Sequence, residues 1–182
     1  MNCCRPVPYL VEFRTLKFLV SGRPEKYKIS SFAQELFKKD VKKLVRVSED
    51  AYDVSVLNAK GIAVEDFLFP DGTFPEIRSI EKWTHIVFQY FIENPGRVLA
   101  VHDRSGLGRA PLLVMIALTE AGMKAVDAFD LIRRKRKGCL NVHQFEGLMK
   151  YKPKCRLKKL YTDLEVTHST SVFPTVLGPI NP

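Results

Sequence analysis

The chain has 182 residues, of which 46% are hydrophobic and 27% are charged, the composition of one globular domain. No stretch approaches the roughly 20 apolar residues that cross a bilayer, and the start, MNCCRPVPYLVEF, lacks the features of a signal peptide. The net charge of +9 favours anionic partners, although a solvated basic helix face would explain the runs at 133–137 and 150–159 equally well.

The cysteines have neither metal-ligand spacing nor the pattern of a disulfide framework. Free thiols are typical of a reducing compartment, so we expect the protein in the cytoplasm or nucleus, without a metal or cofactor. The simplest alternative is that the cysteines carry no chemistry at all. They are Cys3, Cys4, Cys139 and Cys155.

Stretches rich in β-forming residues recur along the first hundred positions. The first two are separated by only two residues, which predicts a pair of neighbouring strands. The last, VLAV, is continuously apolar, as is typical of a strand covered on both faces by helices. The predicted strands are residues 7–13, 16–20, 42–47, 62–67 and 98–101.

Two helices are predicted between the early strands. Ser30 or Ser31 is expected to cap a helix that runs to Lys39. A short helix over 53–60 is expected to end at Gly61. The side chains expected to face the core from the first helix are Phe32, Leu36 and Phe37.

A capping box predicts the start of the next helix. Thr73 would accept a hydrogen bond from the N–H of Glu76, and the Glu76 side chain would return to the N–H of Thr73. The sequence at 94–96, Asn-Pro-Gly, ends this helix. Its expected core face is Ile77, Ile80, Thr84, Val87, Phe88 and Phe91.

Three further helices are predicted in the second half. The first covers 110–121 and the second covers 125–137, while Asn141 with Gln144 opens a third that ends near Lys150. The apolar side of the second is Val126, Phe129 and Ile132.

Strands followed by helices predict an α/β fold, with a central, mostly parallel sheet flanked by helices. We expect one domain over 1–158 and a basic-to-polar tail over 159–182. The basic character that continues into the tail begins at Pro153, and the Ser/Thr/Pro-rich end, from His168, is expected to be disordered in part.

The segment VLAVHDRSGLGRAP at 98–111 carries the clearest functional pattern. A buried strand ends at His102, a loop containing Gly106 and Gly108 follows, and an apolar helix begins near Arg109. Glycines let successive N–H groups point inward, the helix N-terminus adds its positive dipole, and arginine can grip two oxygens of one phosphate. The parts together predict a cradle for an oxyanion, as found in many unrelated proteins.

This segment resembles the signature His-Cys-x-x-Gly-x-x-Arg of cysteine-dependent phosphatases, with His102, Gly106 and Arg109 in place. The run GLGRAP resembles the phosphatases of regenerating liver, protein tyrosine phosphatases of type IVA, in which Ala110 follows the arginine. The resemblance implies a dual-specificity phosphatase fold. Further matches over roughly 7–158 include VRV at 45–47, Glu49, Tyr52, Asp53, Phe69, Asp71, Gly72, Gly122, Asp127, Gly138, Asn141 and YKPK at 151–154.

The resemblance also implies a two-step reaction. A thiolate forms a phosphocysteine, and an aspartic acid protonates the leaving oxygen and then activates water. Asp71, in FPDG, matches the general-acid position, although an aspartate in a Pro-Asp-Gly turn is by itself more often a turn former. Arg109 would bind the phosphate. The expected phosphate loop comprises His102, Arg104, Ser105, Gly106, Leu107, Gly108 and Ala110.

Asp103 stands at the position of the nucleophilic cysteine. An ionised carboxylate there is expected to accept the loop N–H groups, to pair with Arg109 and to repel phosphate. Two negative charges about 4 Å apart cost roughly 4 kcal/mol at an effective dielectric constant near 20. We therefore expect a catalytically inactive pseudophosphatase that acts as a binding or regulatory module.

The alternative is an active protein tyrosine or dual-specificity phosphatase whose nucleophilic cysteine was mutated to Asp103. Ser48 favours the first hypothesis, because it replaces the family cysteine that can form a disulfide with the nucleophile. An acyl phosphate on Asp103 would need a metal site, and no carboxylate cluster accompanies it.

Partners implied by the resemblance are phosphoproteins and CBS-domain magnesium transporters of the cyclin M type. Family members bind the latter through the active-site face, where an acidic transporter residue would be repelled by Asp103. The chain ends GPINP without the family's prenylated cysteine, so the basic stretch at 154–159 predicts only weak contact with anionic membranes. No nucleic-acid-binding motif is present.

Overall fold

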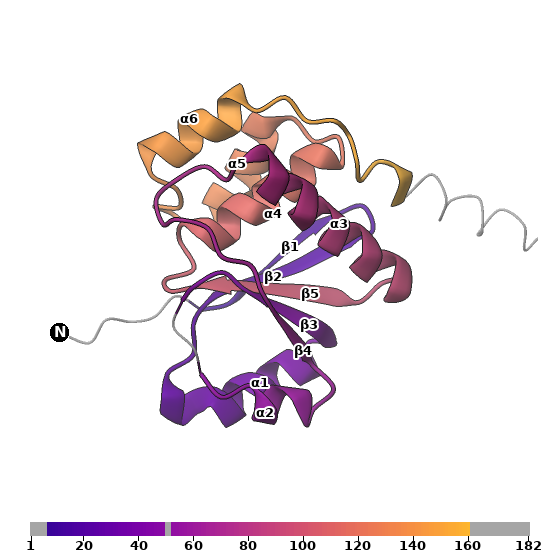
Figure 1. Cartoon of the computed structure of the whole chain (residues 1–182), viewed down its shortest axis with the longest axis vertical. Coiled ribbons are helices and arrows are strands. Elements are labelled where there is room, and N and C mark those ends of the chain that lie inside the picture. Colours follow the sequence, from indigo (N-terminus) through magenta and orange to yellow (C-terminus); the bar gives the residue numbers. More distant parts are fainter. Residues whose placement is uncertain (1–6, 50–51, 161–182) are drawn as a thin grey trace, which may run out of the picture.

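The computed structural model describes residues 7–49 and 52–160. A five-stranded sheet lies between two helical layers, with α1 and α2 on one face and α3 to α6 on the other (Figure 1). The fold is the α/β arrangement predicted from the sequence. The strands are β1 (Tyr9–Phe13), β2 (Leu16–Gly22), β3 (Val41–Arg46), β4 (Ala63–Asp66) and β5 (Val98–Asp103).

The strand order is β1-β2-β5-β3-β4, with an antiparallel β1–β2 pair and three parallel pairs. At the carboxyl edge Gly22 pairs with Asp103, and Arg46 pairs with both His102 and Asp66. Ligands in open α/β sheets bind outside the carboxyl ends of parallel strands. The predicted phosphate loop therefore leaves the sheet at a place suited to a binding site.

Every residue of the central strand β5 is buried, because helices cover both of its faces. One apolar core contains Phe18, Trp83 and Phe91 and lies between the sheet and α3 to α6. The other contains Leu44 and Leu57 and lies toward α1 and α2. Burial of these large side chains, each worth about 1.5–3 kcal/mol, holds the three layers together.

Helix α4 is the centre of its layer, since all twelve of its residues are buried. Helix α6 begins with the predicted capping box: Asn141 accepts the N–H of Gln144, and the Gln144 side chain accepts the N–H of Asn141. The helices are α1 (Ile29–Lys38), α2 (Ser55–Asn58), α3 (Ile77–Glu93), α4 (Arg109–Glu120), α5 (Ala125–Lys135) and α6 (Val142–Lys150).

Two predicted helix starts were wrong. The cap of α1 is Lys28, and neither Ser30 nor Ser31 caps it; the Ser31 hydroxyl donates to the Lys28 carbonyl, 2.9 Å away. The cap of α3 is Glu76, without a side-chain cap bond.

The capping box expected at Thr73 does not form. Its hydroxyl donates instead to the Pro70 carbonyl at 2.8 Å, within the preceding turn. Pro75 explains the difference, because a proline disfavours helical geometry in the residue before it, and Phe74 would have been the first helical residue.

Three residues expected in the core are exposed. Phe37 is 51% exposed, and its ring lies beneath the ammonium groups of Lys42 and Lys60. Ile77 and Val126 are 53% and 55% exposed, because each lies in the first turn of its helix, beyond the edge of the core.

The segment after α6 was predicted to begin a basic tail at Pro153, but it packs onto the domain as far as the structure describes it. Leu157 and Leu160 are fully buried. The buried Glu120 carboxylate accepts the Tyr151 hydroxyl and the N–H of Arg156, and forms an ion pair with the Arg156 guanidinium at 2.7 Å. A boundary at residue 158 remains a prediction.

No helix within 7–49 and 52–160 has the length and apolar character needed to cross a membrane. Predictions about Cys3, Cys4 and the tail from His168 fall outside the described residues.

Candidate functional site

The phosphate loop, residues 102–110, runs from the end of β5 into the first turn of α4. Gly106 has a φ of +73°, and a Cβ added to it would lie 2.8 Å from the backbone N of Gly22. Only glycine fits this close approach to β2. The end of β2 therefore holds the loop in its tight curl.

The carboxylate of Asp103 fills the inside of this curl and is 3% exposed. One oxygen accepts the N–H groups of Ser105, at 2.9 Å, and of Gly106. The other accepts the N–H groups of Gly108, at 3.3 Å, and of Ala110, at 3.0 Å. Four backbone donors that could bind an oxyanion thus already hold one, as the sequence predicted.

Arg109 does not pair with Asp103, which corrects the prediction. Its guanidinium donates to the Glu49 carboxylate at 2.8 Å and to the Phe69 carbonyl at 3.1 Å. Its Nε lies 3.4 Å from Asp71 Oδ1. Since Asp103 is already satisfied by backbone donors, the buried guanidinium turns toward the two outer carboxylates. The Arg109 hydrogen bond lowers the pKa of Glu49.

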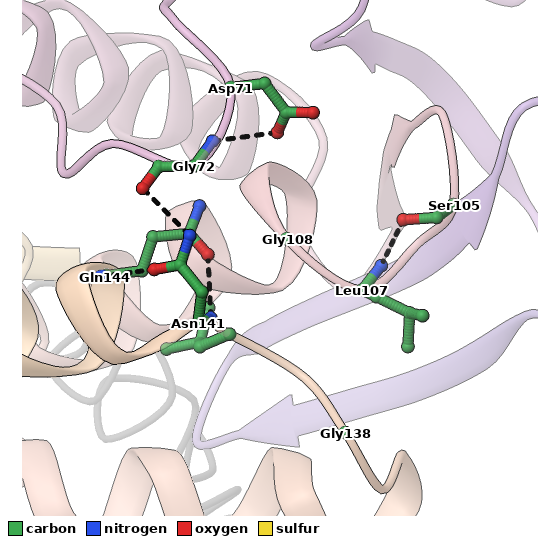
Figure 2. Close-up of a pocket in the computed structure, with 9 residues that line it drawn as sticks. Asp71, Gly72, Ser105, Leu107, Gly108, Gly138, Asn141 and Gln144 are labelled. Carbon is green, nitrogen blue, oxygen red and sulfur yellow. Dashed lines mark hydrogen bonds between the residues drawn. The ribbon is translucent and has the colours of Figure 1, made fainter.

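Asp71 lies over the phosphate loop on the 67–76 connection, where the resemblance placed a general acid. Figure 2 shows its carboxylate turned back to the N–H of Gly72, at 2.9 Å. The Gly72 carbonyl accepts the side-chain amide of Asn141 at 3.0 Å. The connection is therefore tied both to α4, through Arg109, and to the start of α6.

A pocket of about 410 Å³ opens between these segments. Its walls come from the Asp71 connection, the phosphate loop, the segment between α5 and α6 and the start of α6 (Figure 2). The lining residues are Asp71, Gly72, Ser105, Leu107, Gly108, Gly138, Leu140, Asn141 and Gln144.

His102 supports the loop from below and is fully buried. Its Nε2 is 2.7 Å from the Tyr52 hydroxyl, and the two rings are stacked. Burial lowers the pKa of His102 to about 4, so the imidazole is neutral near pH 7. It positions the loop without adding charge beneath Asp103.

The remaining loop residues divide by exposure. Arg104 and Ser105 are exposed, and the Ser105 hydroxyl accepts the N–H of Leu107 at 3.2 Å. Ala110 is buried and has no hydroxyl to offer a ligand. Over the described part of the chain, no three His, Cys, Asp or Glu side chains gather closely enough to hold a metal.

Sequence reasoning missed three members of the site. Glu49 was quoted only as a family match, yet its carboxylate neutralises Arg109. Asn141 was predicted only as a helix cap and a family match, and Gln144 only as its capping partner, although both line the pocket. The sequence separation of Asn141 and Gln144 from the phosphate loop does not predict this proximity, because the packing of α6 against α4 brings them to the pocket.

Comparisons with known proteins agree with this geometry. The PRL-1 phosphatase of Drosophila melanogaster is 44% identical over 154 residues, 85% of this chain and 88% of that protein. The human protein tyrosine phosphatase type IVA 3 is 43% identical over 154 residues, 85% of this chain and 89% of that protein. No family model matches the chain.

Among solved structures, a protein tyrosine phosphatase from Leishmania major superposes with a TM-score of 0.71 at 32% identity, covering 84% of this chain and 99% of that one. The fold is that of the dual-specificity protein tyrosine phosphatases, as the sequence predicted. With relatives above 40% identity over most of both sequences, the chain belongs to the type IVA protein tyrosine phosphatases, the phosphatases of regenerating liver.

Proposed function

We propose that this chain is a non-catalytic member of its family, a pseudophosphatase that acts as a protein-binding or regulatory module. The observation that carries the proposal is the Asp103 carboxylate, which accepts four N–H groups of the phosphate loop. These are donors that a substrate phosphate would need.

The energetics favour the internal carboxylate over an incoming phosphate. Hydrogen bonds to a charged acceptor contribute about 1.5–3 kcal/mol each, and a tethered acceptor loses no translational freedom on binding. A phosphate would also have to displace Glu49 from Arg109. A carboxylate is, in addition, a weaker nucleophile toward phosphorus than a thiolate.

The test is a kinetic assay with an aryl phosphate. We expect the unmodified chain to show no more turnover than Asp103→Ala. Turnover that Asp103→Ala abolishes would mean that the carboxylate acts as a nucleophile, and the proposal would fail.

The assembled Asp71 and Arg109 favour a second candidate, an active phosphatase whose nucleophile was a cysteine at position 103. Asp71 Oδ1 lies 3.4 Å from Arg109 Nε, so the two other catalytic positions of the family are still together. Asp103→Cys should then hydrolyse aryl phosphate, and adding Arg109→Ala should remove that activity. An inert Asp103→Cys variant, folded by circular dichroism, would exclude this candidate.

The partner is proposed to be a protein that docks on the face formed by the Asp71 connection, the phosphate loop and the start of α6. A CBS-domain magnesium transporter that inserts an acidic side chain would be repelled by Asp103 and by Asp71. A pulldown should therefore recover such a transporter more strongly with Asp103→Cys than with the unmodified chain.

A further inference from the structure

Gln144 brings an unused hydrogen-bond donor to the pocket. The residue is 1% exposed, and its Oε1 accepts the N–H of Asn141. Its Nε2 has no hydrogen-bond partner among the described residues. An unpaired buried donor costs about 1–3 kcal/mol, so a ligand that supplies an acceptor recovers that free energy.

Asp71 brings an acceptor to the same place. A Cβ added to Gly108 would lie 3.7 Å from Asp71 Oδ1 and from Gln144 Nε2, and 3.8 Å from Gln144 Oε1, which already accepts the N–H of Asn141. Asp71 Oδ1 and Gln144 Nε2 therefore lie close to one point beside a glycine that has no side chain to separate them. Because the Asp71 side chain is 72% exposed, a ligand can reach its carboxylate.

The surrounding charges disfavour an ionic ligand. An anion would meet Asp71 and, within the loop, Asp103. A cation would meet the donor Gln144 Nε2, the positive N-terminal end of α4 and the guanidinium of Arg109. A neutral group that both donates and accepts fits both polar atoms, and a carboxamide is such a group.

We propose that this pocket binds the side-chain carboxamide of an asparagine or glutamine on a loop of a protein partner. The ligand oxygen accepts from Gln144 Nε2, and its N–H donates to Asp71. Leu107 and Leu140 line the path for the methylene groups. The assignment rests on the proposed function, because it requires a phosphate loop that Asp103 already occupies.

A side chain fits better than a main-chain peptide group. The two polar atoms converge over the single residue Gly108, where the end of a side chain reaches both. A main-chain peptide group would bring the residues on both of its sides close to Gly108 as well. The volume of about 410 Å³ accommodates one side chain with the short stretch of main chain that carries it.

The experiment is a titration of the ¹⁵N-labelled full chain with acetamide, followed by NMR. We expect saturable shifts of the Gln144 side-chain NH₂ and of the Gly108 amide, with a dissociation constant on the order of 100 mM for so small a probe. Acetate and methylammonium should bind at least tenfold more weakly. Tighter binding of N-methylacetamide would overturn the side-chain assignment in favour of a main-chain ligand.

Two variants test the residues. Gln144→Glu keeps the acceptor of the capping box but removes the donor, and should weaken the binding of acetamide at least tenfold. Gly108→Ala places a methyl group between Asp71 Oδ1 and Gln144 Nε2, and should also weaken the binding of acetamide at least tenfold. Glu146→Gln, an exposed change on the same helix, is the matched control and should leave binding unchanged.

The inference is wrong if acetamide leaves the Gln144 signals unmoved, if Gln144→Glu binds it equally well, or if acetate or methylammonium binds as tightly. These failures differ from that of the proposed function. Aryl-phosphate turnover by the unmodified chain would refute the occupied loop, whereas an inert chain that ignores acetamide would refute only the carboxamide site.

Discussion

Asp103 and Arg109 are each neutralised by partners other than one another. Backbone N–H groups surround the Asp103 carboxylate, while Glu49 and the Phe69 carbonyl engage the Arg109 guanidinium. Each charge has a partner before any ligand arrives. The exclusion of phosphate that we propose therefore rests on these two side chains.

The variant Asp103→Ala should expose the loop donors to solvent anions. We expect it to lose about 2–4 kcal/mol of unfolding free energy, because several buried N–H groups lose their acceptor. Tungstate or phosphate should then raise its melting temperature by several degrees and leave that of the unmodified chain unchanged. An equal rise in both proteins would show that Asp103 does not block the loop; thermal denaturation monitored by circular dichroism measures this.

His102 should make stability fall in mild acid. Burial lowers its pKa from the usual 6.5 to about 4, so between these values the unfolded chain binds a proton that the folded chain does not. The contribution is complete above pH 6.5 and is lost as the pH falls toward 4, by about 2.5 kcal/mol at pH 4.5. Urea unfolding at several pH values measures it, and His102→Gln should flatten this slope. An unchanged slope in the variant would assign the effect to other groups.

The connections between elements rely on a few polar anchors. Glu120, at the end of α4, holds the segment after α6 by accepting the backbone N–H groups of Lys154 and Arg156 and the Arg156 guanidinium. Glu81, on α3, contacts the same guanidinium at 2.8 Å but is half exposed. Because Glu120 is buried and Glu81 is not, we expect Glu120 to contribute more to the stability of this segment.

Glu120→Gln should destabilise the protein by about 3 kcal/mol, since it leaves a partly buried arginine without its buried counter-charge. The matched change Glu81→Gln should cost less than about 1 kcal/mol, because that pair is exposed to solvent. Urea denaturation gives both values, and hydrogen exchange over 151–160 should quicken only in the first variant. Equal effects would contradict the assignment.

The two predicted capping boxes give a second test at this scale. Asn141→Ala should cost about 1 kcal/mol, since the cap of α6 is real. Thr73→Ala should cost about half as much or less, because Thr73 makes only a turn hydrogen bond to Pro70. Chemical denaturation compares them, and a larger loss at Thr73 would show that it caps α3 in solution.

On the scale of the whole molecule, the net charge of +9 predicts nonspecific attraction to anionic surfaces. Vesicles with phosphatidylserine should bind the full chain at about 50 mM salt. Near about 300 mM salt most of the bound protein should be released, because screening shortens the range of the attraction. Zwitterionic vesicles are the control in a sedimentation assay. Binding that persists at high salt would require an apolar anchor.

Much of the architecture could be predicted because its signals are local. Stretches rich in β-forming residues predicted the five strands, and Asn141 with Gln144 predicted the start of α6. The error at Thr73 arose because Pro75 disfavours helical geometry at Phe74, and the error at Phe37 arose where surface cations cover its ring. Ser31 lies inside the first turn of α1, and its hydroxyl donates to the Lys28 carbonyl.

The sequence by itself determined the family, the phosphate loop and the carboxylate at position 103, because the order of residues and their chemistry are sufficient for these. Only the tertiary structure decided that Arg109 pairs with Glu49, and that Gln144 and Asp71 share a pocket over Gly108. Those contacts join residues far apart in the chain. Their distances depend on how α4, α6 and the loops pack on the sheet, which no local pattern records.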